Sequence, residues 1–303
     1  MKKFISQQIK DFVSKPLFNE EAILKKDSLF PKISIITPSY NQGKFLERTI
    51  LSVLNQNYPN MEYIIIDGGS KDNSVEIIRK YEKYLTYWVS ESDNGQSHAI
   101  NKGLGIATGD LVAWQNSDDI YLPGAFDLIS KIYDKNPNYD VYFGNMHLID
   151  EKDNIKEELR YTPFSLLCLL YEGWNITNQS VFFQGRVIKK YSFNEALHYA
   201  MDADLFIRLG IDKRSFKFIR DFMGCLRIHS QTKGCTIGNS IGVEEWIKIL
   251  SPLGIKMQDD IPWNKQYRLY KIACDVRKLL FYLLQGDIDY IVKRFNRLFA
   301  KTG

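Results

Sequence analysis

The chain has 303 residues, of which 45% are hydrophobic and 25% charged, and a formal net charge of +4. This composition is typical of a soluble globular protein and excludes collagen-like, coiled-coil, low-complexity and disulfide-scaffold chains. The length suits about two domains, with a core that needs neither disulfides nor a structural metal. The charge is too mild for a dedicated nucleic-acid binder, so no nucleic-acid partner is expected.

The cysteines and the first residues indicate a cytosolic protein. No two cysteines have the CxxC spacing of a zinc or redox site, so reduced thiols are expected at Cys168, Cys225, Cys235 and Cys274. Lys2 and Lys3 are not followed by an apolar segment, so no signal peptide is predicted. The longest apolar runs are too short to cross a bilayer.

After an amphipathic lead-in over residues 1–30, strands and helices alternate. Short β-branched or apolar runs predict strands at residues 33–36, 63–66, 87–89 and 111–114. Apolar residues at helical spacing predict helices at residues 44–54, 74–84 and 97–107, and Pro123 suits the first turn of the next helix. The alternation predicts an α/β fold with a mostly parallel central sheet and helices on both faces.

The pattern loosens in the second half. It predicts strands at residues 141–143 and 181–183, helices at 164–171 and 202–209, and a strand pair at 216–219 and 224–228. Beyond Ser240 the chain is predicted to be mostly helical. We therefore expect three parts, namely the lead-in 1–30, an α/β domain 31–235 with halves 31–130 and 131–235, and a basic helical extension 236–303.

Four polar segments directly follow predicted strands, at residues 37–41, 67–70, 91–96 and 116–119. Since ligands of parallel sheets bind beyond the carboxyl ends of the strands, these segments should meet at one edge. The adjacent carboxylates of Asp118 and Asp119 repel each other unless a cation lies between them, and carboxylate oxygens suit Mg²⁺ or Mn²⁺. The alternative is a solvated turn that caps the following helix. No GxGxxG follows the first strand, which argues against a nicotinamide dinucleotide fold.

Seven short motifs occur in a fixed order over about 100 residues. They are Thr37-Pro38-Ser39-Tyr40-Asn41, Leu51-Ser52-Val53-Leu54-Asn55-Gln56, Ile66-Asp67-Gly68-Gly69-Ser70 with Asp72-Asn73-Ser74, Ser90-Glu91-Ser92-Asp93-Asn94-Gly95-Gln96, Ala99-Ile100-Asn101-Lys102-Gly103, Ala107-Thr108-Gly109-Asp110 and Asn116-Ser117-Asp118-Asp119. In order and spacing, residues 32–129 resemble the nucleotide-sugar domain of the family 2 glycosyltransferases, which have the GT-A fold. The resemblance implies a nucleotide-sugar half over 31–130 and an acceptor half over 131–235.

The resemblance also implies the donor site. The residues expected to bind the nucleotide-sugar are Thr37, Pro38, Tyr40, Asn41, Asp67, Ser70, Asp93, Asn101, Lys102 and Asp118. Asp119 would be the direct ligand of a divalent metal, Mn²⁺ or Mg²⁺, in a DxD-type motif. Asp118 would share the ion or orient the ribose, because Ser117 stands where the fullest motif has an acid. His229, in Arg227-Ile228-His229-Ser230, could reach the metal or have a structural role.

In the second half, the resemblance implies a catalytic base and an acceptor site. Asp202, in Met201-Asp202-Ala203-Asp204, would take the proton of the acceptor hydroxyl, although a carboxylate there could instead cap a helix. Asn178 and Gln179 resemble a segment near the acceptor pocket. Trp174 could stack on a sugar ring or pack in the core.

The reaction implied is transfer of a sugar, with inversion, from a nucleotide-diphosphate sugar. We expect a UDP-sugar as donor, and as acceptor a hydroxyl of a glycan or lipid-linked glycan in surface polysaccharide biosynthesis. A sugar nucleotidyltransferase is one alternative, but residues 37–41 lack the basic, glycine-rich phosphate loop that it needs. A non-catalytic nucleotide-sugar or glycan-binding protein is another, and it would tolerate loss of Asp119 and Asp202.

The tail carries the positive charge. Residues 264–303 contain nine Lys or Arg and three acidic residues, a net charge of +6. Two apolar stripes at helical spacing are flanked by these bases: Leu269, Ile272, Val276, Leu279, Leu280 and Leu283, then Ile288, Ile291, Val292, Phe295, Leu298 and Phe299. Basic amphipathic helices bind anionic membranes. We expect a cytoplasmic protein that is peripheral on the inner membrane face, with packing of the tail on the catalytic domain as the alternative.

Overall fold

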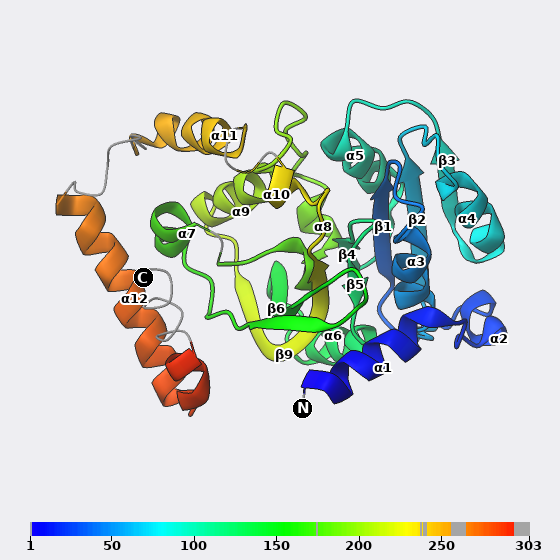
Figure 1. Cartoon of the computed structure of the whole chain (residues 1–303), viewed down its shortest axis with the longest axis horizontal. Helices are drawn as coiled ribbons and strands as arrows, with labels where there is room; N and C mark the ends of the chain where they lie inside the picture. The colour runs from blue at the N-terminus through cyan, green and yellow to red at the C-terminus, as the bar shows by residue number, and fades with distance from the viewer. Residues whose placement is uncertain (1, 174, 237, 239–240, 256–264, 294–303) are drawn as a thin grey trace.

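The computed structural model describes residues 2–173, 175–236, 238, 241–255 and 265–293. One curled, nine-stranded mixed sheet runs through the molecule, with helices packed around it (Figure 1). The strands are β1 (Ile33–Ser39), β2 (Met61–Asp67), β3 (Tyr87–Ser90), β4 (Leu111–Trp114), β5 (Ile120–Tyr121), β6 (Val141–Ile149), β7 (Ile155–Leu159), β8 (Val181–Gln184) and β9 (Phe216–Arg227). Their order is β3-β2-β1-β4-β8-β6-β9-β5, and β7 pairs with β6.

Helices connect and cover these strands. They are α1 (Lys2–Ser14), α2 (Glu20–Leu24), α3 (Leu46–Leu54), α4 (Ser74–Tyr81), α5 (Gln96–Ile106), α6 (Ala125–Lys135), α7 (Leu166–Glu172), α8 (Gly185–Ile188), α9 (Met201–Ile211), α10 (Lys233–Thr236), α11 (Ile241–Leu250) and α12 (Lys265–Leu284). Single 3₁₀ turns occur at η1 (Glu82–Tyr84), η2 (Asn178–Ser180) and η3 (Ser251–Leu253).

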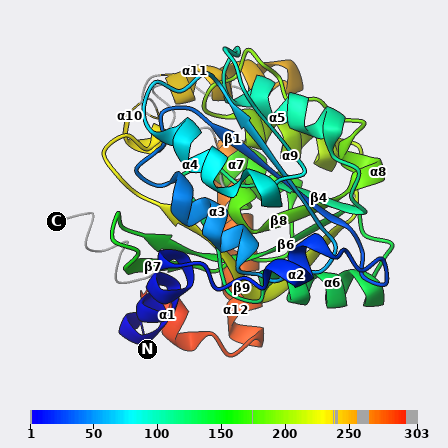
Figure 2. The same ribbon diagram turned by 90° about the vertical axis from the view of Figure 1, so that its right-hand side faces the viewer.

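The first half is the parallel unit that the sequence predicts. β3, β2, β1 and β4 pair in parallel, with Ile33 opposite Met61 and Ser39 opposite Asp67. Successive side chains of a strand point to opposite faces, and here both faces are covered. Ile64 and Ile66 pack with α5, whereas the intervening Ile65 packs with α3 and α4. This arrangement brings the carboxyl ends of the strands to one edge (Figure 2).

The second half of the sheet is mixed. β8 is antiparallel to both β4 and β6, β7 is antiparallel to β6, and β9 is parallel to β6. The predicted strand pair at 216–219 and 224–228 is wrong, because both segments belong to the single strand β9. Its register shifts between Ile219, opposite Gly144, and Gly224, opposite Met146. A β-bulge of this kind breaks the alternation that sequence patterns report and bends the strand. As a result, the end of β9 reaches β5, next to Asp118 and Asp119.

The first and last segments pack on opposite parts of this body. In the lead-in, Ile9 and Val13 of α1 pack with residues of β5, β6, β7 and β9. At the other end, α12 runs along α7 and buries Cys274 and Tyr282 (Figure 1). Much of its predicted apolar stripe nevertheless stays exposed, including Leu269 at 59% and Leu280 at 54%. Phe295, Leu298 and Phe299 lie outside the described residues. Within the described part, no helix is long and apolar enough to cross a membrane.

Candidate active site

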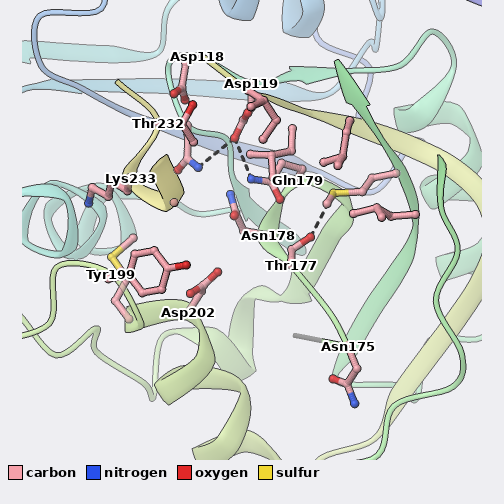
Figure 3. Close-up of a pocket in the computed structure, with 18 of the residues that line it drawn as sticks. Asp118, Asp119, Asn175, Thr177, Asn178, Gln179, Tyr199, Asp202, Thr232 and Lys233 are labelled. Carbon is pink, nitrogen blue, oxygen red and sulfur yellow. Dashed lines mark hydrogen bonds between the residues drawn. The ribbon is translucent and has the colours of Figure 1, made fainter. Parts of the chain in front are cut away.

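A cleft of about 1660 Å³ opens at the carboxyl ends of the parallel strands and continues into the second half of the molecule. Eight of the predicted site residues line it: Pro38, Tyr40, Asp93, Asp118, Asp119, Asn178, Gln179 and Asp202. In Figure 3, Asp118 and Asp119 lie at one side of the cavity and Asp202 at the other, with Asn178 between them in this view. The fold thus brings together residues that lie up to about 160 positions apart in the sequence.

Four predicted donor residues lie in and beside the turns next to the cleft, but they are not among the described residues that line it. The buried carboxylate of Asp67 accepts hydrogen bonds from the Ser70 amide at 2.9 Å and the Ser90 hydroxyl at 2.7 Å, and it also accepts from the Ser70 hydroxyl. Asn41 links this turn to the preceding one, because its amide donates to Ser70 Oγ and its Oδ1 accepts from the Lys71 amide, both at 2.8 Å. Thr37 is buried, with Oγ1 3.2 Å from the Tyr63 hydroxyl. The role of Asp67, Ser70, Asn41 and Thr37 in this geometry is to hold the two turns together.

Two predicted donor contacts are not supported by this geometry. Asn101 exchanges hydrogen bonds with the Phe193 backbone at 2.8 and 3.0 Å, so it ties α5 to the second half of the fold. Lys102 forms an ion pair with Glu91 at 2.6 Å. Neither side chain is among the described residues that line the cleft. Both occur within a motif, but α5 directs them away from the cavity.

Asp119 is the deeper of the two adjacent carboxylates and is fully buried. Its Oδ1 accepts from the Arg227 amide at 2.8 Å, and its Oδ2 accepts from Gln179 Nε2 at 2.8 Å and Asn116 Nδ2 at 3.0 Å. Burial, followed by the neighbouring Asp118, raises the pKa of Asp119 to about 8. Its two oxygens thus accept from three donors, and its role as a metal ligand stays a prediction.

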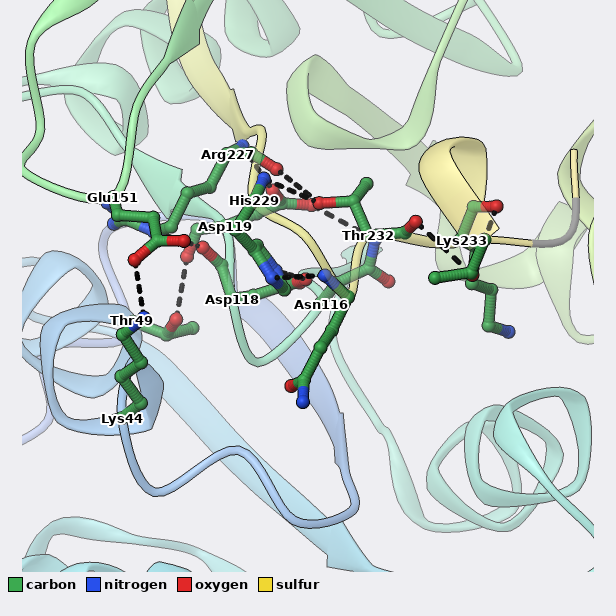
Figure 4. Close-up of polar contacts among 12 residues, drawn as sticks. Lys44, Thr49, Asn116, Asp118, Asp119, Glu151, Arg227, His229, Thr232 and Lys233 are labelled. Atoms are coloured by element: carbon green, nitrogen blue, oxygen red, sulfur yellow. Dashed lines mark hydrogen bonds and ion pairs between the residues drawn. The ribbon is translucent and has the colours of Figure 1, made fainter.

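Asp118 is the carboxylate that is open to the cleft. Its Oδ2 lies 3.0 Å from Nε2 of His229, and the His229 ring packs against Phe45 with centroids 4.7 Å apart (Figure 4). A carboxylate oxygen and an imidazole nitrogen are both good ligands for Mn²⁺, and a carboxylate alone suits Mg²⁺. The chemistry of this pair therefore fits a divalent cation.

Arg227, a residue with no role in the sequence-based prediction, fixes this pair in place. Its side chain is fully buried, its Nε donates to the Asp118 carbonyl at 2.8 Å, and its guanidinium pairs with Asp153. Sequence reasoning placed the Arg227-Ile228-His229 segment near the metal but missed the arginine. Burial of an arginine beside a carboxylate pair would have indicated its role. The sequence alone does not show that Arg227 is buried.

Asp202 lies at the second position of α9 and faces the cleft (Figure 3). Desolvation by burial raises its pKa from 3.8 to about 7. The start of α9 is held by Glu245, whose buried carboxylate accepts from the His198 amide at 2.6 Å and from the Tyr199 and Ala200 amides at 2.8 Å. These three amides are therefore satisfied by Glu245 of α11, which leaves Asp202 able to take part in chemistry.

The predicted acceptor residues line the cleft between these two sites. Asn178 and Gln179 form the η2 turn, and Gln179 also supports Asp119. Within the described part of the chain, Asn178 Nδ2, Gln179 Oε1 and Asn175 Oδ1 are buried without a hydrogen-bond partner. Unpaired buried polar atoms in a cleft suit a polar ligand. Trp174 lies outside the described residues.

A different cluster is the one group of three metal-ligating side chains in the described residues. Cys168, Glu172 and Cys274 lie where α7 meets α12, with their ligand atoms within 4.8 Å of one another. Lys278 already supplies a cation there, since it forms an ion pair with Glu172. This cluster thus serves to join the two helices.

The sequence of the chain is similar to those of known proteins. The family model described as Glycosyl transferase family 2 matches residues 34–194, slightly more than half of the chain. An uncharacterized glycosyltransferase of Rickettsia typhi is 31% identical over 65% of this chain and 61% of its own length, and one of Rickettsia prowazekii is 32% identical over 61% and 60%. The chain therefore spans about three fifths of the length of these relatives.

Solved structures support the GT-A fold. Residues 1–349 of S. aureus TarS, in complex with UDP-GlcNAc, have a TM-score of 0.59 at 18% identity, with 75% of this chain and 68% of that chain covered. The mannosyltransferase PcManGT from Pyrobaculum calidifontis, in complex with GDP-Man and Mn²⁺, has a TM-score of 0.55 at 14% identity, with 85% and 72% covered. At these identities the similarity shows the fold.

Proposed function

This chain belongs to glycosyl transferase family 2, and on that premise we propose that it transfers a sugar from a UDP-sugar to a hydroxyl of a lipid-linked glycan, with inversion at the anomeric carbon. The observation that carries the proposal is one cleft that Asp118 lines at one side and Asp202 at the other, with the buried His229 3.0 Å from Asp118 Oδ2. A donor diphosphate needs a cation-binding carboxylate on one side of the reacting carbon, and an acceptor hydroxyl needs a general base on the other.

Each residue has a part in the proposed reaction. The acceptor oxygen forms a bond to the anomeric carbon, the bond from that carbon to the diphosphate oxygen breaks, and the hydroxyl proton passes to Asp202. A pKa of about 7 suits this step, because a base with a pKa near the working pH combines ionisation with basicity. Asn175 and Asn178 would orient the acceptor, and Gln179, Asn116 and Arg227 would keep the carboxylate pair in position.

Asp118 and His229 are the residues that would hold Mn²⁺ or Mg²⁺. When bound, such an ion neutralises the negative charge of the leaving diphosphate. The deeper Asp119 would act mainly by fixing the loop that carries Asp118. UDP as the nucleotide is supported by the neighbour that binds UDP-GlcNAc, whereas another neighbour binds GDP-Man.

The membrane part of the proposal concerns α12. Its exposed Leu269, Ile272 and Leu280 form an apolar surface on a basic segment, which suits the anionic inner face of a membrane. A cytoplasmic enzyme at that surface would meet a lipid-linked acceptor of surface polysaccharide synthesis. Co-sedimentation with phosphatidylglycerol vesicles tests this. Leu280→Glu should reduce vesicle binding, and equal binding of wild type to anionic and phosphatidylcholine vesicles would contradict it.

Calorimetric binding of UDP, GDP, dTDP and CMP, with Mn²⁺, Mg²⁺ or EDTA, tests the donor site. We expect metal-dependent binding of UDP, a loss of at least tenfold in Asp118→Asn, and unchanged binding in Asp202→Asn. With the matching donor sugar, Asp202→Asn should be inactive. Folded protein that binds no nucleotide would refute the proposal and favour a glycan-binding protein.

A further inference from the structure

The cleft is larger than a donor site requires. Small-molecule sites usually occupy about 300–1,000 Å³, whereas this cleft measures about 1660 Å³. Part of this cleft is lined by side chains of β6, β7, α7 and α12 and of the helical residues 288–293. We call this part the distal chamber.

The distal chamber differs in chemistry from the rest of the cleft. Between Asp118 and Asp202, the buried Asn178 Nδ2 without a partner provides a polar contact. Toward α12 the lining combines the aliphatic Leu159, Val276, Leu279 and Ile291 with charged side chains of β7, α7 and α12. Val276 remains 48% exposed and Leu279 38% exposed, although both line the chamber. When an apolar group covers an aliphatic wall that is open to a cavity, the free energy of the system falls.

The charges around the distal chamber are largely balanced. Arg160 forms ion pairs with Glu158 and Asp287, and Lys278 pairs with Glu172. Lys271 and Asp275, both on α12, add one charge of each sign to the lining. A chamber with balanced charges has no general attraction for a polyanionic glycan, and a hydrocarbon chain fits its aliphatic wall better.

We infer that the distal chamber binds the hydrocarbon chain of the acceptor, an alkyl or isoprenoid chain joined to the sugar whose hydroxyl lies at Asp202. The inference rests on the proposed function and adds to it the site that holds the lipid. Aliphatic side chains of α12, in the same continuous cleft as Asp202, suit an amphipathic molecule with its sugar at the catalytic base. The same α12 then has two roles, with one side facing the chamber and the other facing outward.

Substitutions at two neighbouring leucines can distinguish these two roles of α12. Leu279 lines the chamber, whereas Leu280, 54% exposed, is not among the described residues that line it. Leu279→Glu and Leu280→Glu therefore introduce the same charge at adjacent positions of one helix. Because both side chains are partly exposed, we expect both variants to fold, and Val276→Glu provides a second chamber variant.

The probes are octyl and methyl glycosides of glucose, galactose, mannose and N-acetylglucosamine, used below the micelle concentration without vesicles. Binding is measured by saturation-transfer NMR and calorimetry, with UDP and Mn²⁺ binding as an independent readout. We expect at least one octyl glycoside to bind tenfold or more tightly than its methyl partner. Leu279→Glu and Val276→Glu should remove most of this preference, and Leu280→Glu should change it less than twofold.

The outcomes are distinguishable. Equal affinity for octyl and methyl glycosides, or equal effects of Leu279→Glu and Leu280→Glu, would overturn the inference while UDP binding leaves the proposed function standing. If the wild type does not bind UDP, the proposed function itself is rejected.

Discussion

Glu245 lies outside the reacting centre, yet the structure predicts that both stability and turnover depend on it. Its two carboxylate oxygens satisfy three consecutive backbone amides, 198–200, directly before the helix that carries Asp202. Glu245→Ala would leave these amides buried or partly buried without an acceptor. It would also remove a negative charge from the start of α9, where the helix dipole favours it.

The expected loss of stability follows from the number of hydrogen bonds that Glu245 accepts. A buried donor without a partner costs about 1–3 kcal/mol, and losses within one cluster are not additive. We expect Glu245→Ala to lower the free energy of unfolding by about 3 kcal/mol, which corresponds to a fall in Tm of roughly 6–9 °C in a protein of this size. Glu245→Gln keeps one carbonyl oxygen and should cost about 1–2 kcal/mol, because its amide group cannot accept a hydrogen bond from the remaining backbone amides.

The assay combines thermal unfolding with steady-state kinetics. Below the unfolding transition, Glu245→Ala should lower kcat, because the turn that positions Asp202 loses its support, and should leave UDP binding within twofold of wild type. The neighbouring Glu244 is exposed on the same helix, so Glu244→Ala is the matched control and should shift stability by less than about 0.5 kcal/mol. If Glu245→Ala and Glu244→Ala unfold within 1 °C of each other with equal kcat, the reasoning fails.

Four further predictions concern the cleft and the residues that support it. Activity should rise as Asp202 loses its proton near pH 7 and level off above, as a pH profile of kcat would show; a flat profile from pH 5.5 to 8.5 would exclude Asp202 as the base. Because the folded-state pKa of Asp202 exceeds its unfolded value of 3.8, its stabilising effect is complete below that value and is lost as the pH rises through 7. The full pKa shift corresponds to a destabilisation of about 4 kcal/mol, and water in the cleft reduces it. Asp202→Asn should therefore be inactive, but its free energy of unfolding at pH 8, measured by chemical denaturation, should be about 1–2 kcal/mol higher than that of wild type. Arg227→Met should destabilise the fold by about 2–4 kcal/mol, measured in the same way, because the Asp118 carbonyl loses its donor and Asp153 is left with Arg48 as its partner; a change below about 1 kcal/mol would contradict this. Gly68→Ala would place a Cβ 2.9 Å from Asp93 Oδ2, so the Kd for UDP should rise about tenfold in calorimetry, with Gly105→Ala, which meets no neighbour, as control.

The parallel half of the sheet was predictable because its signals are local. Short runs such as residues 63–66 end in glycine-containing turns, and parallel pairing then places Asp93 and Asp118 at one edge. The resemblance to a known family added Asp202 and the acceptor residues, which local pattern alone could not assign. In the structure, Asp202, Asn178 and Gln179 line one cleft.

The remaining features depend on contacts between distant segments. Glu245 acts on amides about 45 positions earlier, and Asn101 binds the backbone of Phe193, so neither partner is evident from sequence spacing. The depth of Asp119 depends on Gln179 and Arg227, and the bulge in β9 depends on its pairing with β6. Burial and register of this kind follow from tertiary packing, to which a one-dimensional pattern is insensitive.

The position of α12 in the chain has a consequence for how this protein can diversify. The helix follows the last strand, contributes nothing to the sheet register, and is joined to the body largely along α7 through a cluster that includes Cys168 and Cys274. By contrast, the turns at 37–41 and 67–70 are interlocked, so a change in one disturbs the other. Replacement of α12 can therefore reshape the cleft wall while the turns at 37–41 and 67–70 stay intact, which makes α12 a suitable segment to exchange between relatives.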